Sequence, residues 1–233
     1  MYYYLRFDAG KMGHFPSGGR MVRGYDYSAP TSVKRIPWYG EIPFVPDLHS
    51  CKLKKRTFLT DVLCVTMLPS FGSGKMLASK NLLSLLQKTR SDEYQKFNAT
   101  VKYRKELVNY YFLNFYNDQY AAINYNYSAL RYKHGPFDEE YVTLNPIGSR
   151  TAYENLVLKL GGKISPYTNK LIKPRSSPIN FTKICLDKVI ADLDVFYIGE
   201  CTKEIIISDR LKYAFDIHCI TGLDYCPIDV TFR

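Results

Sequence analysis

A strand that ends in serine and opens a helix is the feature that most constrains the fold of this chain. In the stretch EIIISDRLKYAFDIH, three consecutive isoleucines at 205–207 favour an extended strand, because β-branched side chains suit a pleated surface. The apolar residues that follow have the i, i+3, i+4 spacing of an amphipathic helix, which we expect over residues 209–218. Ser208 lies between the two elements. Its hydroxyl can accept a hydrogen bond from an otherwise unpaired backbone N–H, so the sequence predicts an N-cap there.

The alternative for Ser208 is a reactive hydroxyl. A hydrolase nucleophile at a strand-to-helix turn is typically flanked by glycines, in the pattern G-x-S-x-G, because the turn is tight. Here Ile207 and Asp209 flank the serine. His218 would lie at the opposite end of the helix, roughly 15 Å away at a rise of 1.5 Å per residue. The sequence therefore favours a structural cap, and it predicts no catalytic residue.

The same pattern occurs earlier in the chain. The segments DVLCV, LASKNLLSLL and YQKFNATV, within residues 61–101, correspond to DVFYI, IISDRLKYAF and LDYCPIDV, within residues 194–230. Aligning Ser79 with Ser208 makes Ser79 a second predicted N-cap. Amphipathic helices alone generate some matches of this kind, so a duplication is a hypothesis at this point. The pattern predicts an α+β fold with mixed or antiparallel sheets, few helices and two related strand-helix-strand units.

The chain divides into two parts on this pattern. Residues 1–105 hold an arm rich in Tyr, Gly and Pro, followed by the first unit, and residues 106–233 hold the second. A chain of 233 residues with 46% hydrophobic composition can bury a core as one large domain or as two small ones packed together. The two parts are therefore expected either as neighbours or as one continuous domain.

The net charge of +10 is the strongest compositional signal. It predicts affinity for an acidic partner, which is a nucleic acid, an anionic membrane surface or an acidic protein face. No stretch is typical of a secretory signal or a membrane-spanning helix, and the six cysteines lack metal-ligand spacing and indicate free thiols. We therefore expect a cytoplasmic protein that holds no metal and no cofactor.

One short motif invites a phosphate-loop interpretation. FGSGK, at residues 71–75, ends in Gly-Lys, but a phosphate loop requires G-x-x-x-x-G-K followed by Ser or Thr. Pro69 stands where the first glycine is required, and Met76 stands in place of the hydroxyl residue. A hairpin turn is the better prediction for this segment.

The segment 106–137 is the most aromatic part of the chain. Its tyrosines form either an aromatic core and sheet face or a binding face, since Tyr combines a rigid contact area with a polar tip. Aromatic and basic residues are the types enriched at the centre of protein interfaces. On that basis the candidate partner-binding residues are Tyr116, Tyr120, Tyr125, Tyr127, Arg131 and Lys133.

Four passages resemble a family of bacterial immunity proteins from polymorphic toxin systems. They are VNYYFLNFY (108–116), ICLDKVIADLDVFYIGE (184–200), EIIISDRLKYAFDIH (204–218) and ITGLDYCPI (220–228). The resemblance covers residues 108–228 best, and it implies a cytoplasmic protein that binds and neutralises a cognate toxin, with no catalytic residue of its own. A positively charged inhibitor suits a toxin that presents an acidic surface.

Two other functions remain open on the sequence. A nucleic-acid-binding module would use the basic and aromatic surface, and its affinity would fall steeply with salt. A hydrolase would need a site assembled from residues that are dispersed along the chain.

Overall fold

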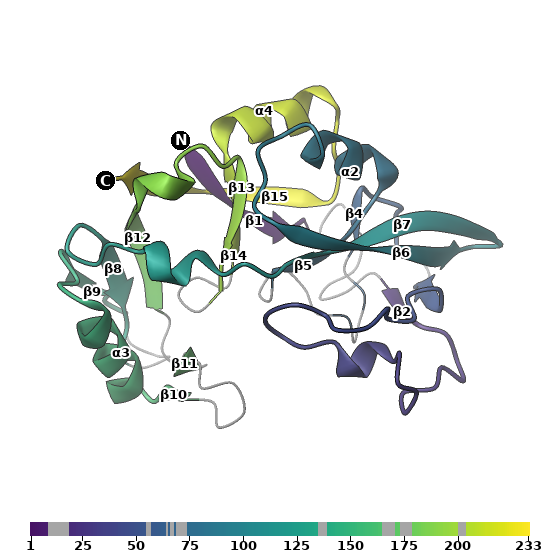
Figure 1. The fold of residues 1–233 in the computed structure, drawn as a ribbon, viewed down its shortest axis with the longest axis horizontal. Helices are drawn as coiled ribbons and strands as arrows, with labels where there is room; N and C mark the ends of the chain where they lie inside the picture. Colours follow the sequence, from purple (N-terminus) through teal and green to yellow (C-terminus); the bar gives the residue numbers. More distant parts are fainter. Residues whose placement is uncertain are drawn as a thin grey trace.

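The computed structural model shows an α+β fold with two mixed β-sheets and a few helices, as the sequence predicts (Figure 1). The structure describes residues 1–8, 19–54, 57–63, 65, 68, 74–134, 139–164, 171–172, 179–199 and 204–233. Residues 71–73 of the FGSGK segment lie outside this set. No helix among the described residues is long and apolar enough to cross a membrane.

The first sheet has the strand order β2-β3-β6-β7-β5-β4. Its strands are β2 (Gly19–Met21), β3 (Cys51–Leu53), β4 (Val62–Leu63), β5 (Lys75–Ala78), β6 (Tyr94–Tyr103) and β7 (Glu106–Phe115). The helix α2 (Lys80–Leu86) follows β5, and the short 3-10 helix η1 (Val33–Arg35) lies in the arm between β2 and β3.

The second sheet has the order β13-β14-β1-β15-β12-β8-β9. Its strands are β1 (Tyr2–Phe7), β8 (Ala129–Tyr132), β9 (Val142–Leu144), β12 (Ile179–Leu186), β13 (Val195–Ile198), β14 (Glu204–Ser208) and β15 (Leu223–Phe232). The helices of this half are η3 (Gln119–Ala122), α3 (Arg150–Lys159), η4 (Lys188–Ile190) and α4 (Asp209–Ile217). A separate two-stranded ladder joins β10 (Lys163–Ile164) to β11 (Leu171–Ile172).

The two sheets repeat one topology. In the first, β4, β5, β7 and β6 are successively antiparallel, β6 runs parallel to β3, and β3 is antiparallel to β2. In the second, β13, β14, β1 and β15 are successively antiparallel, β15 runs parallel to β12, and β12 is antiparallel to β8. The two related units expected from the sequence are therefore present, and they extend well beyond the strand-helix-strand segments.

The strand β1 occupies in the second sheet the place that β7 occupies in the first. Ala78 pairs with Tyr111, and its counterpart Ile207 pairs with Tyr3. The register then aligns YYFLNF at 110–115 with YYYLRF at 2–7, in which four of the six residues are identical. The first strand of the chain therefore completes the sheet that is otherwise built from the C-terminal half.

This arrangement crosses the division at residues 105 and 106. That boundary falls in the turn between β6 and β7, which pair along their whole length in the first sheet. Sheet membership therefore does not follow the division into residues 1–105 and 106–233, because β7 belongs with the N-terminal unit and β1 with the C-terminal one.

Both predicted N-caps have the same geometry. The Ser79 hydroxyl accepts a hydrogen bond from a backbone N–H in the first turn of α2 at 3.1 Å, and it donates one to Asp61 Oδ1 at 2.6 Å. The Ser208 hydroxyl accepts from the first turn of α4 at 3.2 Å and donates to Asp194 Oδ1 at 2.7 Å. Each serine thus lies at the junction of a strand and a helix, caps the helix and donates to the aspartate that precedes the neighbouring strand.

Each aspartate also joins the two units. The backbone N–H and hydroxyl of Thr221, which follows α4, both donate to Asp61 Oδ2 at 2.9 Å. The backbone N–H of Arg90, which follows α2, donates to Asp194 Oδ2 at 3.2 Å. The helices α2 and α4 contact each other, and their leucine and phenylalanine side chains share one core with the inner faces of both sheets (Figure 1).

The outer face of each sheet has its own cover. The arm between β2 and β3 closes the outer face of the first sheet, where Val33, Ile36 and Ile42 join a second core. The helix α3 closes the outer face of the second sheet, where Tyr153 and Val157 join a third.

Candidate functional site

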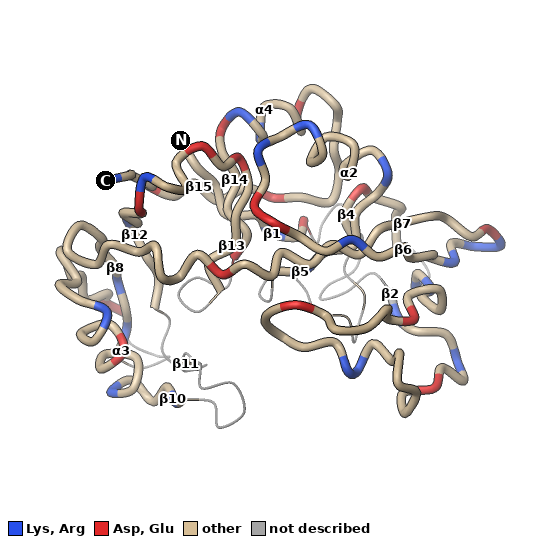
Figure 2. The backbone as a smooth tube through the Cα atoms, viewed as in Figure 1, with Lys and Arg blue, Asp and Glu red and all other residues tan. Residues whose placement is uncertain are grey.

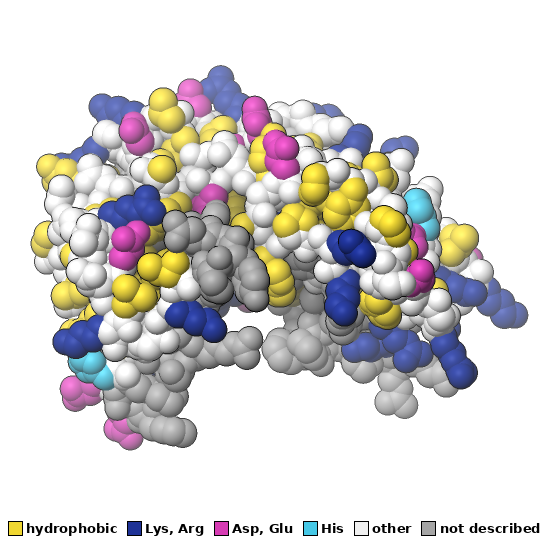
Figure 3. All heavy atoms as spheres, turned by 60° about the horizontal axis from the view of Figure 1, so that its bottom comes forward, with side chains coloured by type: hydrophobic (Ala, Val, Ile, Leu, Met, Phe, Trp, Pro, Cys, Tyr) yellow, Lys and Arg dark blue, Asp and Glu magenta, His cyan; other side chains and the backbone are white. Residues whose placement is uncertain are grey.

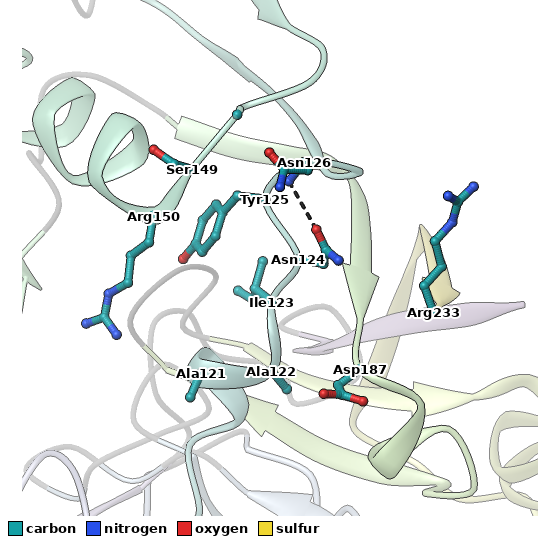
Figure 4. A pocket seen from close by; sticks show the side chains of 11 residues that line it. Ala121, Ala122, Ile123, Asn124, Tyr125, Asn126, Ser149, Arg150, Asp187 and Arg233 are labelled. Carbon is teal, nitrogen blue, oxygen red and sulfur yellow. Dashed lines mark hydrogen bonds between the residues drawn. The ribbon is translucent and has the colours of Figure 1, made fainter.

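A pocket of about 340 Å³ lies at the end of the parallel strands β12 and β15 (Figure 4). It is lined by the segment 121–126, by residues 148–150, by Asp187 and by Arg233. Asp187 directly follows β12 and Arg233 directly follows β15, so the two strand ends supply one wall of the pocket.

The segment 121–126 forms the centre of the lining because it is tied to the end of β12. The backbone N–H of Asn124 donates to the Cys185 carbonyl at 2.8 Å, and that of Asp187 donates to the Ala122 carbonyl at 2.9 Å. Within the segment, the Asn124 side-chain oxygen accepts from the Asn126 N–H at 3.2 Å (Figure 4). The loop is therefore fixed before any ligand arrives.

The start of α3 forms the opposite wall. Ser149 caps this helix by accepting a hydrogen bond from the Ala152 N–H at 3.0 Å. The next residue, Arg150, places its guanidinium 4.5 Å from the centre of the Tyr120 ring and donates to Glu154 at 2.7 Å. The hydrogen bond from Arg150 to Glu154 is the main reason that the pKa of Arg150 is raised.

Arg233 closes the pocket on the side away from Arg150 (Figure 4). Its backbone continues the pairing of β12 and β15, since its N–H donates to the Leu186 carbonyl at 2.9 Å. Its guanidinium lies 3.9 Å from the centre of the Tyr127 ring, a cation–π contact on a ring that is 46% exposed. An arginine held on a tyrosine thus stands at each side of the pocket.

A second group of this kind lies on the neighbouring strands β8 and β9. Arg131 and Lys133 approach the Tyr141 ring, with their charged groups 4.8 Å and 4.7 Å from its centre. Arg131 and Tyr141 are exposed and Lys133 is partly buried. This group places two cations and one tyrosine at the edge of the second sheet.

The six predicted contact residues divide between surface and core. Tyr127, Arg131 and Lys133 belong to the two groups just described. Tyr116 is partly buried, and its hydroxyl donates to Glu93 at 2.8 Å, which is the main cause of its raised pKa. The six predicted residues therefore do not form one contiguous surface.

The expectation of an exposed contact surface does not hold for Tyr120 and Tyr125. They are only 5% and 6% exposed, their rings pack against each other, and the Tyr125 ring packs against Tyr153 in the core beneath α3. They support the pocket from below, because a tyrosine-rich segment with alternating apolar positions can turn its rings inward as readily as outward.

Three residues of the site were missed in the sequence. Tyr141, Arg150 and Arg233 are far apart in the chain and reach the site through the fold of the second sheet. Arg150 had one local signal, because it follows a serine of N-cap type. Arg233 had another, since the repeat aligns it with Arg104, at the end of β6.

The arrangement is suited to binding. Ser208, the hydroxyl considered as a nucleophile, accepts one hydrogen bond and donates another within the α4 cap. Among the described residues no three His, Cys, Asp or Glu side chains come together as metal ligands. What the pocket and its surroundings present is positive charge on flat aromatic rings, which can receive carboxylates and other planar anionic groups.

The sequence matches no protein-family model and no curated protein. The two units of the chain can still be compared with each other, position by position, because their strands share one register.

Proposed function

We propose that this chain is a cytoplasmic immunity protein, which neutralises a toxin by binding an acidic face of it. The proposed contact is the cation–tyrosine surface, which we define as Tyr127, Arg131, Lys133, Tyr141, Arg150 and Arg233. The observation that carries the proposal is the seating of four cationic side chains on tyrosine rings in the second unit, two beside the pocket at the end of β12 and β15 and two at β8 and β9 along the edge of the sheet.

Such a surface favours protein binding for two reasons. Arginine and tyrosine are the residue types most enriched among those that dominate binding energy. A guanidinium already held on a ring loses less side-chain entropy when it meets a carboxylate, so less of the binding energy is spent on ordering it. The resemblance of residues 108–228 to immunity proteins supplies the identity of the partner as a toxin.

The charge of the whole chain acts in the same direction. Lys and Arg residues are spread along both halves of the backbone (Figure 2), and the net charge is +10. Opposite net charges raise association rates by steering the encounter, and rapid capture is what an antidote requires.

The test begins with capture of partners by the tagged chain from an extract of its own cells, with and without nuclease treatment. We expect a stoichiometric protein that resists nuclease and moderate salt. Expressed alone, that protein should arrest growth, and co-expression of this chain should restore it.

The double variant Arg131→Glu/Lys133→Glu locates the contact. It should weaken capture by about 100-fold or more, because two cations at the interface become repulsive. The variant Lys80→Glu/Lys88→Glu makes the same charge change at exposed positions of α2 and its C-terminal end and should bind normally. Equal loss in both variants, or loss of all captured material after nuclease treatment, would contradict the proposal.

A further inference from the structure

A second pocket lies at the end of the parallel strands β3 and β6 of the first sheet. It has a volume of about 520 Å³ and is lined by residues 52–54, 57–58 and 103–104. Pockets that hold small ligands commonly have volumes of ~300–1,000 Å³. This pocket is separate from the cation–tyrosine surface, which belongs to the second unit.

The two pockets occupy the same position in the two units. The pair Lys52 and Lys102 in the first sheet corresponds to Cys185 and Thr231 in the second. Two residues further along each strand, Lys54 and Arg104 correspond to Asp187 and Arg233. Both of these pairs line their pockets. The repeat therefore placed a pocket beside each parallel strand pair.

An arginine stands at the corresponding position of both units. Arg104 lies 5.1 Å from the centre of the Tyr103 ring, as Arg233 lies 3.9 Å from that of Tyr127. Arg104 adopts a φ of 55°, in the turn between β6 and β7. Each unit thus places an arginine on a tyrosine ring beside its pocket, although the two tyrosines come from different segments.

Charge distinguishes the two copies. In the second unit Asp187 stands where the first has Lys54, and it offsets Arg233. Among the described residues, the first-unit pocket is lined by Lys52, Lys54 and Arg104 and by no carboxylate. Figure 3 shows Lys and Arg side chains gathered at the right-hand end of the molecule, where the turn between β6 and β7 lies in Figure 1. Of the two corresponding pockets, as the described residues line them, the first-unit pocket holds three cations and the second holds Arg150 and Arg233.

Aromatic rings complete the lining. Phe58 is 60% exposed and Tyr103 lies beneath Arg104, so the pocket offers apolar surface beside its cations. A phosphate group is the anion that Lys and Arg groups of this kind hold, and an exposed ring stacks on a nucleobase. From this geometry we propose that the first-unit pocket binds a nucleotide, with the phosphate at Lys52, Lys54 and Arg104 and the base on Phe58.

The proposal is tested by calorimetric titration of the full chain at low salt. The probes are adenosine monophosphate, adenosine, inorganic phosphate and a short single-stranded oligonucleotide. We expect adenosine monophosphate to saturate one site, and adenosine and phosphate to bind at least about tenfold more weakly, because each lacks half of the contacts. An oligonucleotide that binds much more tightly, with a steep salt dependence, identifies a strand as the source of the nucleotide. Equal affinities for the oligonucleotide and adenosine monophosphate identify the free nucleotide as the ligand.

The variants Lys52→Gln and Phe58→Ala should each weaken adenosine monophosphate binding by about tenfold or more. Both residues are exposed, so the fold is expected to tolerate the changes. Lys88→Gln and Tyr213→Ala make matched changes at exposed positions elsewhere and should leave the affinity unchanged. Absence of saturable binding to either nucleotide probe, or unaltered binding by the two pocket variants, would overturn the proposal.

Discussion

At the scale of single residues, the buried carboxylate of Asp194 joins several parts of the fold. Asp194 is 3% exposed and accepts hydrogen bonds from Ser208, from Arg210 and from the backbone of Arg90. Burial by itself would raise the pKa of Asp194, but the hydrogen bonds from Arg210 and Ser208 outweigh it, and the pKa is lowered. The Asp194 carboxylate therefore holds several segments together, and its protonation at low pH should destabilise the fold.

Asp194→Ala should lower the free energy of unfolding by about 3 kcal/mol at pH 7, because it leaves buried donors without an acceptor. A lowered pKa in the folded state gives stability that is present above the unfolded pKa of about 4 and is lost as the pH falls through the folded value. The difference between the unfolding free energies of the variant and the wild type, measured by urea denaturation, should therefore become smaller below about pH 4.

Asp192→Ala is the control for this prediction. Asp192 is two residues away and pairs with Arg90 at 3.1 Å, but its side chain is 84% exposed. Its loss should cost less than about 1 kcal/mol. An equal loss of unfolding free energy in the two variants would mean that burial does not determine the strength of these contacts.

At the scale of elements, the position of β1 between β14 and β15 is the main feature that the sequence alone does not reveal. The caps at Ser79 and Ser208 and the alignment of 94–101 with 223–230 were predictable, because strand, cap and helix signals are local. The pairing of β1 with β14 and β15 joins residues about 200 positions apart and has no local signal. The burial of Tyr120 and Tyr125 could not be predicted either, because an alternation of apolar and polar residues indicates two faces of a strand without showing which face is buried.

A circular permutant tests this placement. In the first unit, residues 105–108 separate Arg104 from Asn109, the counterparts of Arg233 and Met1. A permutant that begins at residue 19 and carries residues 1–8 after Arg233, joined by a four-residue linker, should fold with a near-normal melting temperature. The chain that simply lacks residues 1–8 should unfold far more readily, because β14 and β15 would lose the strand between them. Similar stability of the truncated chain and the permutant would contradict the assigned role of β1.

At the scale of the whole molecule, the two units are joined by contacts that each makes to the other. Thr221 binds Asp61, Arg90 binds Asp194, and α2 and α4 share a core. We therefore expect one cooperative unfolding transition. Hydrogen exchange measured in rising denaturant should show amides of β6 and β12 converging on one opening free energy. Different opening free energies for β6 and β12 at high denaturant would indicate that the two units unfold independently.

The placement of β1 also sets the order in which the protein can be completed during synthesis. The first sheet uses residues 19–115, all of which are synthesised before β14 and β15. The second sheet contains the earliest strand of the chain and the latest, so β1 leaves the ribosome long before β14 and β15 exist. At about 5–20 residues per second, that interval is on the order of 10–40 s. During it, the segment YYYLRF has no partner strand and is open to capture by chaperones or by another sheet edge.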